Sequence, residues 1–297
     1  MFNIFKKSAQ TGLVTIGYPQ KPAQISAQFR GAPAFDFAAW RDARLAAEAC
    51  PTGAIQIRDA DARRTVTVDY GLCNFCGECA EADASGAIKI TQNFDLAVHE
   101  RDDLIVTAEY PLQPDGSQGE LASLRTGDSS QSLPLEALEE KLQHKIHSLL
   151  GRSLAIRQVD AGSCNGCEIE IGALNNPIYD LERLGIHFVA SPRHADMLLV
   201  TGPVTRNMEL ALVKTWRATP EPKLVVASGS CAISGGIFGI NYATRGGVSA
   251  VLPVDVFIPG CPPRPHALLH GILLALGRME QRELPRQVTS AMNEYLS

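Results

Sequence analysis

Hydrophobic positions in the C-terminal half of the chain predict strands and helices in alternation. Short β-rich runs are expected at 154–159, 187–189, 197–200, 223–227 and 254–258. Apolar residues at helical spacing predict helices between several of these runs, notably at 207–218 and 265–279. Such alternation is typical of an α/β domain with a mostly parallel sheet, in which functional residues collect in loops beyond the carboxyl ends of the strands.

The N-terminal half has a different pattern and contains a degenerate internal repeat. The sequence CPTGAIQI at 50–57 matches DASGAIKI at 83–90, and in each copy a turn with glycine leads to a short strand. A repeat of this size, with short strands and few large hydrophobic residues, resembles the two-fold-symmetric bacterial ferredoxin fold. We therefore expect an α+β ferredoxin-like domain at 1–110.

A polar stretch separates the two halves. Residues 111–134 are rich in Gly, Ser and Pro and have no hydrophobic periodicity, which indicates a linker. Residues 135–150 then have apolar positions at helical spacing, with Pro134 at the entry, so we expect an amphipathic helix there. The predicted division is thus 111–150 for linker and helix, 151–285 for the α/β domain and 286–297 for a tail.

Composition excludes some classes of protein. The 297 residues are 45% hydrophobic and 20% charged, and the net charge of −5 argues against a nucleic-acid surface. The N-terminus lacks a signal-peptide pattern. The longest apolar stretch, at 267–276, is interrupted by His270 and Gly271 and is too short to span a bilayer, so we expect any membrane contact to go through a partner.

The cysteines are the strongest chemical signal. The eight are Cys50, Cys73, Cys76, Cys79, Cys164, Cys167, Cys231 and Cys261. Without a signal peptide, C-x₂-C pairs indicate metal binding or redox chemistry rather than disulfides.

The first four cysteines match one half of a two-cluster ferredoxin pattern. In that pattern the fourth cysteine of each C-x₂-C-x₂-C-x₃-C run binds the other cluster. One cluster would use positions 40, 43, 46 and 83, which here are Trp40, Ala43, Ala46 and Asp83. The other would use Cys50, Cys73, Cys76 and Cys79, and all four are present.

This partition predicts that one whole cluster is lost and its neighbour is retained. Trp40 and the two alanines are apolar and could fill the vacated volume, whereas Asp83 is a turn residue or a residual carboxylate ligand. The run of three cysteines favours a 4Fe–4S cluster, and zinc is the main alternative.

The remaining four cysteines are spread over three loops. Cys164 and Cys167 form a C-x₂-C pair, and Cys231 and Cys261 are distant in the sequence. Nearby glycines permit tight turns and close approach of backbone N–H groups to sulfur. Thiolates suit either an iron–sulfur cluster or a structural zinc ion, and spacing alone does not separate the two.

Four motifs in the C-terminal half add a family resemblance. The sequences GSCNGCEIEI, LLVTGPVTRNM, ASGSCAISGG and VDVFIPGCPPRP resemble the small subunit of group 4 membrane-bound nickel–iron hydrogenases and the homologous 20 kDa subunit of respiratory complex I. The segments TGLVTIGYP, QFRGAPAFD, CPTGAI and LCNFCGEC are similar to the ferredoxin-like subunit of formate hydrogenlyases. The chain thus resembles a fusion of two subunits.

The resemblance implies two 4Fe–4S clusters, one on each set of four cysteines, in an electron-transfer subunit of an oxidoreductase. Implied partners are a nickel–iron hydrogenase-type large subunit, membrane-integral subunits, and an electron-donor module or soluble ferredoxin. The implied location is the cytoplasmic face of the inner membrane, through those partners. The two residues between Cys164 and Cys167 match the hydrogenase form, since the complex I subunit typically has adjacent cysteines there.

Three functional interpretations remain open from the sequence. They are a hydrogenase electron-transfer subunit, the equivalent subunit of a complex I-like quinone oxidoreductase, and a zinc-stabilised structural protein. Glu168 and Glu170 follow the C-x₂-C pair, and the resemblance makes a role in a proton path possible. Carboxylates stabilised at a helix N-terminus are the alternative for these two residues.

Overall fold

The C-terminal half contains the parallel sheet that its hydrophobic pattern predicts. The computed structural model describes residues 2–19, 21–127 and 153–279, so the helix expected at 135–150 and the tail expected at 286–297 lie outside the described residues. The strands are β7 (Leu154–Asp160), β8 (Ile186–Phe188), β9 (Met197–Thr201), β10 (Leu224–Ser228) and β11 (Val256–Ile258). Their spatial order is β8-β7-β9-β10-β11, with every neighbouring pair parallel.

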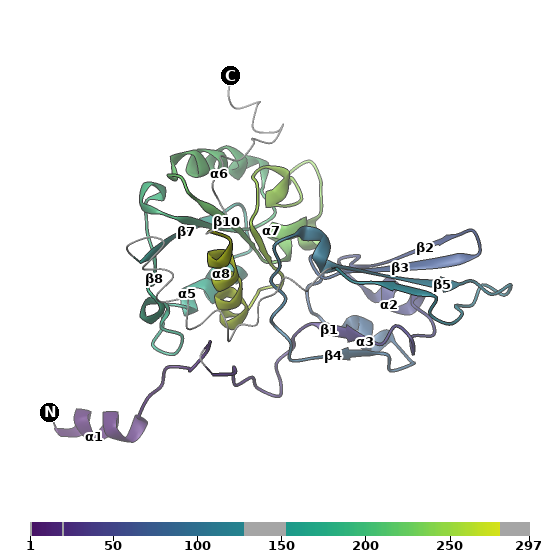
Figure 1. The fold of residues 1–297 in the computed structure, drawn as a ribbon, viewed down its shortest axis with the longest axis horizontal. Helices are drawn as coiled ribbons and strands as arrows, with labels where there is room; N and C mark the ends of the chain where they lie inside the picture. The colour runs from purple at the N-terminus through teal and green to yellow at the C-terminus, as the bar shows by residue number, and fades with distance from the viewer. Residues whose placement is uncertain (1, 20, 128–152, 280–297) are drawn as a thin grey trace.

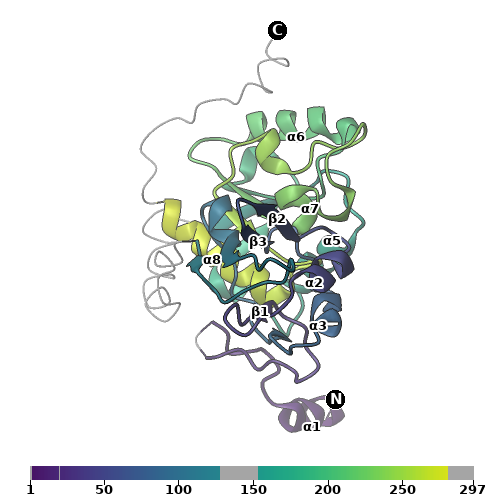
Figure 2. The ribbon, with the colours of Figure 1, turned by 90° about the vertical axis from the view of Figure 1, so that its right-hand side faces the viewer.

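This strand order is that of the flavodoxin-like fold, 2-1-3-4-5, with the switch point between β7 and β9. Helices cover both faces of the sheet (Figure 2). The helices are α5 (Gly166–Ala173), α6 (Arg206–Ala218), α7 (Ser230–Ser234) and α8 (Pro265–Met279). The α/β fold expected for this half is therefore confirmed.

Alternating residues of each strand enter two separate cores. In β10, Leu224 and Val226 pack in one core with residues of α5 and α8, whereas Val225 and Ala227 pack in the other with residues of α6 and α7. Because neighbouring side chains of a strand point to opposite faces, a strand buried on both faces becomes a continuous apolar run. This explains why β9 and β10 are buried at every position.

The N-terminal half folds in the order βαββαβ. Its elements are β1 (Pro33–Phe35), α2 (Arg44–Ala49), β2 (Ile55–Ala60), β3 (Arg63–Asp69), α3 (Glu78–Ala82) and β4 (Ile88–Ile90). β1 pairs with β4 and β2 pairs with β3, both antiparallel, and α2 packs against α3. The two copies of the sequence repeat thus occupy equivalent places, each at the end of a short helix and before a strand.

The stretch expected to be a linker is partly ordered as sheet. β5 (Ile105–Pro111) pairs with β3, and β6 (Ser123–Arg125) pairs with β5, so the four strands form an antiparallel sheet in the order β2-β3-β5-β6. This sheet projects from the α/β half (Figure 1). The described residues also include five short 3₁₀ helices, at Arg101–Leu104, Leu181–Leu184, Pro192–His194, Gly236–Phe238 and Val248–Ala250.

The two halves are connected by hydrogen bonds as well as by the chain. Val98 and Phe257 exchange backbone hydrogen bonds of 3.1 and 2.9 Å, so residue 98 lies alongside β11 at the end of the parallel sheet. The Ile16 N–H donates to the carbonyl of Ile178 at 2.8 Å. Segments of the first hundred residues therefore pack directly on the α/β half.

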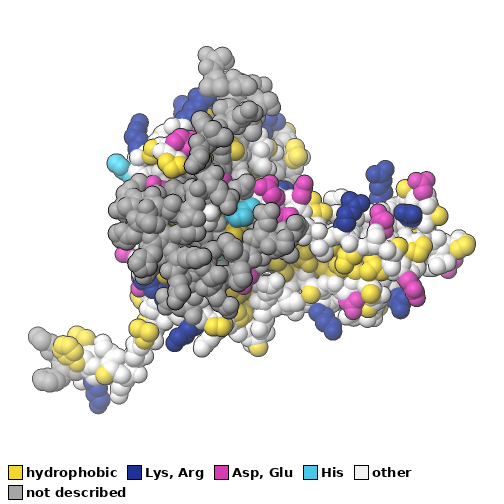
Figure 3. Space-filling model, in the orientation of Figure 1, with side chains coloured by type: hydrophobic (Ala, Val, Ile, Leu, Met, Phe, Trp, Pro, Cys, Tyr) yellow, Lys and Arg dark blue, Asp and Glu magenta, His cyan; other side chains and the backbone are white. Residues whose placement is uncertain are grey.

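The first helix, α1 (Phe2–Thr11), extends away from the rest of the molecule (Figure 1). Hydrophobic and basic side chains are both visible on it in Figure 3, and Ile4 and Phe5 are exposed. Among the described residues, no helix combines the length and the apolar character needed to cross a bilayer.

Candidate functional site

The four cysteines of the C-terminal half gather beyond the carboxyl ends of three strands. Cys164 follows β7, Cys231 follows β10 and Cys261 follows β11. Cys167 and Cys231 lie in the first turns of α5 and α7, where the sequence predicted only loops. Both helices begin after a residue with positive φ, Asn165 at 69° and Gly229 at 90°.

These four thiols interact with one another. Burial, together with the neighbouring Cys261 and Cys164, raises the pKa of Cys231 to about 11. Burial also raises the pKa of Cys167 far above its usual value, with added contributions from Glu168 and the other three cysteines. The loops therefore bring the predicted set of four together.

Glycines leave room around these sulfur atoms. A Cβ at Gly229 would lie 2.7 Å from the Sγ of Cys167, and a Cβ at Gly236 would lie 3.0 Å from the Sγ of Cys231. Gly229 and Gly236 also have positive φ, of 90° and 52°. Any side chain at these two positions would enter the space beside the sulfur atoms and would strain the backbone.

The four cysteines of the N-terminal half line one small cavity. Cys50 is the C-cap of α2, Cys79 lies on α3, and Cys73 and Cys76 lie in the loop before α3. Apart from Asn74, the remaining lining residues are apolar or glycine: Pro33, Phe35, Ala54, Ile55, Val68, Phe75 and Gly77. Burial raises the pKa of Cys73 to about 12 and that of Cys79 to about 11, and the neighbouring thiols of the set contribute to both shifts.

Backbone N–H groups donate to two of these sulfur atoms. Ala54 N–H donates to the Sγ of Cys50 at 3.3 Å, and Phe75 N–H donates to the Sγ of Cys73 at 3.4 Å. Such N–H···S bonds stabilise a thiolate and tune a bound metal centre. Across the described residues, no three His, Cys, Asp or Glu side chains are placed to hold a single metal ion.

Asp83 occupies the place in α3 that Cys50 occupies in α2. It is the C-cap of α3 and is buried, whereas the sequence suggested a turn residue near the surface. Its Oδ1 accepts from the N–H of Ser85 at 3.1 Å and from its hydroxyl at 2.6 Å, and its Oδ2 accepts from the N–H of Ile88 at 3.0 Å. Through these three hydrogen bonds the carboxylate stabilises the turn that leads into β4.

The other three positions at which the two-cluster ferredoxin pattern has cysteine form part of the core. Trp40, Ala43 and Ala46 are each at most 1% exposed and pack with residues of β2, β3 and β5. The Trp40 ring lies 5.4 Å from that of Phe35 and 6.0 Å from that of Phe37, measured between centroids. These apolar side chains are part of a packed core, and their replacement of a lost cluster stays a prediction.

Replacing Asp83 with Asn is expected to destabilise the protein by about 1–3 kcal/mol near neutral pH, because an amide NH₂ would face the N–H of Ile88 or Ser85. Burial acts to raise the pKa of Asp83, but hydrogen bonds from Ser85, Ile88 and Ala87 outweigh it and hold the pKa below its usual range. A depressed carboxyl pKa contributes stability above the unfolded pKa of about 3.9, and this stability is lost as pH falls through the folded pKa.

The difference in stability between the wild type and Asp83→Asn should therefore shrink below about pH 4. Thermal midpoints measured anaerobically across this range at one scan rate would test this expectation. A difference that does not change with pH would contradict the assigned role of the carboxylate.

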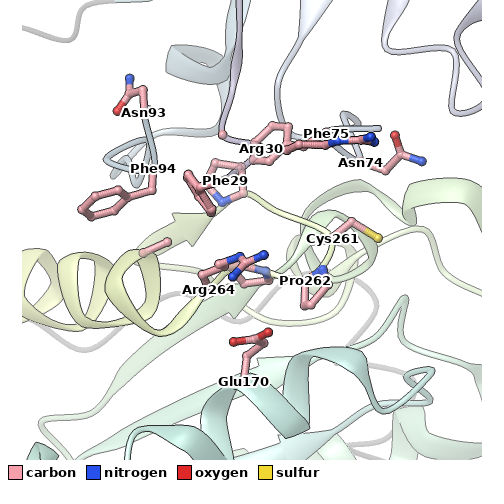
Figure 4. Close-up of a pocket in the computed structure, with 14 residues that line it drawn as sticks. Phe29, Arg30, Asn74, Phe75, Asn93, Phe94, Glu170, Cys261, Pro262 and Arg264 are labelled. Carbon is pink, nitrogen blue, oxygen red and sulfur yellow. The ribbon is translucent and has the colours of Figure 1, made fainter. Parts of the chain in front are cut away.

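A pocket lies between the two halves, next to Cys261 (Figure 4). The N-terminal half contributes Phe29, Arg30, Asn74, Phe75, Asn93 and Phe94, and the C-terminal half contributes Glu170, Cys261, Pro262 and Arg264. The Arg264 guanidinium stacks over the Phe29 ring at 5.0 Å from its centroid. Sequence reasoning missed this pocket, because its residues come from segments that no local pattern connects.

Glu168 and Glu170 lie in different environments. Glu170 lines the pocket, where its carboxylate points toward Arg264 (Figure 4). Glu168 accepts a hydrogen bond from the Thr201 hydroxyl on one oxygen, while its other oxygen, Oε2, is buried without a hydrogen-bond partner among the described residues. The two carboxylates therefore differ in what they could do chemically.

A parallel sheet with four thiols at the carboxyl ends of its strands defines an α/β protein with a four-cysteine site. Residues 164–275 match the model of the family described as NADH ubiquinone oxidoreductase, 20 Kd subunit. The chain is 50% identical over 141 residues to the probable membrane-bound hydrogenase subunit mbhJ of Pyrococcus furiosus, which covers 47% of this chain and 84% of that protein. The chain belongs to the family of the 20 kDa subunit of NADH ubiquinone oxidoreductase.

Other relatives show the breadth of this family. Formate hydrogenlyase subunit 7 of Escherichia coli is 52% identical over 131 residues, which is 44% of this chain and about half, 51%, of the relative. A subunit of the NADH-quinone oxidoreductase of Citrifermentans bemidjiense is 53% identical over 108 residues, 36% of this chain and 62% of the relative. A chain in the structure of the membrane-bound sulfane sulfur reductase, an archaeal respiratory membrane complex, is 38% identical with a TM-score of 0.41, covering 49% of this chain and 78% of that one.

Proposed function

We propose that this chain is the iron–sulfur electron-transfer subunit of a membrane-associated nickel–iron hydrogenase complex. The observation that carries the proposal is the gathering of all eight cysteines into two sets of four, one in each half. The relatives named above are subunits of oxidoreductases, among them a formate hydrogenlyase and a membrane-bound hydrogenase. The peripheral membrane location follows from that assembly, through partner subunits.

The residues at both sites fit a 4Fe–4S cluster, the cofactor of this family. In the C-terminal set, four thiols converge from three loops, and Gly229 and Gly236 leave space at the sulfur atoms. In the N-terminal set, four thiols line a cavity of mostly apolar character and receive backbone N–H groups. The βαββαβ order with paired β1–β4 and β2–β3 supports a ferredoxin-like N-terminal domain that retains one cluster.

Bound clusters would supply one-electron transfer, and the chain's own residues set the conditions for it. Buried thiols with raised pKa values are protonated in the free protein, so cluster assembly must release their protons. The N–H groups of Ala54 and Phe75 then stabilise negative charge on sulfur. Apolar neighbours such as Phe35 and Ile55 exclude water from the N-terminal set.

Exposed apolar side chains lie on the elements that carry the C-terminal cysteines. Ile169 follows Cys167 on α5, and Ile237 and Phe238 follow α7; all three are exposed. Ile240 and Tyr242 are more exposed still, at 82% and 92%. Together with the exposed Cys164 and Cys261, these side chains support docking of the large subunit against this site.

Glu168 is our candidate for a proton path at the same site. Its free, buried oxygen could accept a proton, and its other oxygen is fixed by Thr201. Exchange of Glu168 for Gln in the assembled complex is expected to lower hydrogen-evolution turnover on the order of 100-fold, with unchanged iron content. The matched change Glu170→Gln should have a smaller effect, and equal losses in both variants would argue against this assignment.

Metal and sulfide analysis of the anaerobically purified chain tests the proposed function. About eight irons and eight labile sulfides per chain would support it, since each 4Fe–4S cluster contains four of each. Near-stoichiometric zinc without visible absorbance would instead support a zinc-stabilised structural protein.

A complex I-like quinone oxidoreductase is the second candidate, because the matching family model carries that description. The nickel content of the purified assembly separates the two redox functions. A large subunit that holds nickel supports the hydrogenase, and one without nickel supports the quinone oxidoreductase.

A further inference from the structure

A single buried hydroxyl connects the two cysteine sets. The Ser230 Oγ donates to the carbonyl oxygen of Cys73 at 2.6 Å and also lies 3.2 Å from the carbonyl oxygen of Gly260. Ser230 is 2% exposed and begins α7, which lies on the side of the α/β half that faces the N-terminal half (Figure 1). This contact therefore crosses the interface between the halves, and the Ser230 side of it is buried.

Each of these three residues is a cysteine of one set or the immediate neighbour of such a cysteine in the sequence. Ser230 immediately precedes Cys231, Gly260 immediately precedes Cys261, and Cys73 itself belongs to the N-terminal set. The Ser230 N–H also donates to the Gly260 carbonyl at 2.9 Å, which holds the two C-terminal loops together. A route from the Cys73 sulfur to the Cys231 sulfur thus runs through covalent bonds and one short hydrogen bond.

We propose that Ser230 is a positioning residue that links the two four-cysteine sites for electron transfer. The inference rests on the proposed function. One electron leaves the reduced site and reduces the other by one electron, in either direction, and the hydroxyl keeps its proton because no bond to hydrogen is broken. Electronic coupling through bonds and a short hydrogen bond is stronger than coupling across a gap, so loss of this hydroxyl should slow the transfer.

Ser234 provides a matched control for this proposal. It lies one turn further along α7, where its hydroxyl lies 3.1 Å from the carbonyl oxygen of Ser230 and donates to the carbonyl oxygen of Gly71 at 2.7 Å. This bond crosses the same interface, but neither Ser234 nor Gly71 is a cysteine or the immediate neighbour of one. A purely structural contribution of the interface should therefore respond similarly to Ser234→Ala and Ser230→Ala.

The experiment uses the full chain, purified anaerobically with its metal, as wild type and as Ser230→Ala, Ser230→Thr and Ser234→Ala. Iron and labile sulfide are measured first. Flash photoreduction with a deazaflavin then delivers single electrons, and rapid-freeze electron paramagnetic resonance follows their redistribution between the two sites. The reduction potential of each site is determined by titration in the same samples.

Ser230→Ala is expected to slow redistribution severalfold at unchanged potentials, while Ser234→Ala matches wild type and Ser230→Thr restores most of the rate. Equal rates of electron redistribution in Ser230→Ala, Ser234→Ala and wild type would overturn the proposed role of Ser230. The fully reduced wild type should also show magnetic interaction between its two sites, and its absence would overturn the link without any variant. A wild-type protein with fewer than two iron–sulfur clusters per chain would instead overturn the proposed function.

Discussion

Replacing Cys50 with Ala is expected to halve the iron content, from about eight to about four irons per chain, because four thiolates are needed to hold each 4Fe–4S cluster. The lost iron should belong to the same spectroscopic cluster that Cys76→Ala removes. Cys50 is distant from the other three cysteines in sequence, but it lines the same cavity. Iron analysis and electron paramagnetic resonance of both variants would check this expectation.

Asp83→Asn is the matched control, because Asp83 occupies the equivalent place in the second copy of the repeat. This variant should keep all its iron. It should lose stability, because the Asp83 carboxylate accepts hydrogen bonds from Ser85 and Ile88. A Cys50→Ala protein with both clusters intact, or an Asp83→Asn protein with one cluster missing, would show that the ligands are assigned incorrectly.

Replacing Trp40 with Ala is expected to lower the free energy of unfolding by about 3–5 kcal/mol, the usual cost of deleting a fully buried large aromatic side chain. Trp40 is 1% exposed and packs against the rings of Phe35 and Phe37, which stack on each other. Because Phe35 also lines the cavity of the N-terminal cysteines, the cavity wall should loosen as well. Anaerobic urea unfolding, followed by circular dichroism, would measure the loss.

Tyr242→Ala is a suitable comparison for Trp40→Ala. Its side chain is 92% exposed, so the isolated chain should change in stability by no more than about 0.5 kcal/mol. A Trp40→Ala protein as stable as Tyr242→Ala would mean that the indole does not contribute to the stability of this core.

The sequence predicts the α/β half well because its strands are buried on both faces. The predicted runs 197–200 and 223–227, apolar except for Lys223, correspond to β9 and β10 within a residue or two. The grouping of the cysteines also follows from the sequence, since the cross-run pattern assigns Cys50 to the distant run at 73–79. Both predictions depend on local spacing or on a repeat, which a single sequence displays directly.

Contacts between distant segments could not be predicted in this way. The segment 123–125 has no strand pattern, yet it pairs with β5 at the edge of a sheet whose other strands come earlier in the chain. Burial of the Asp83 carboxylate depends on where Ser85 and Ile88 place their N–H groups. The pocket beside Cys261 exists only because the two halves pack together.

The backbone contact between Val98 and Phe257 has a consequence for biosynthesis. β11 is the last strand of the parallel sheet, and an uncovered edge strand is a template for aggregation with other chains. The N-terminal half leaves the ribosome first, so Val98 is available to pair as soon as β11 emerges. A C-terminal half produced alone would have this edge open and would need a separate chain to cover it.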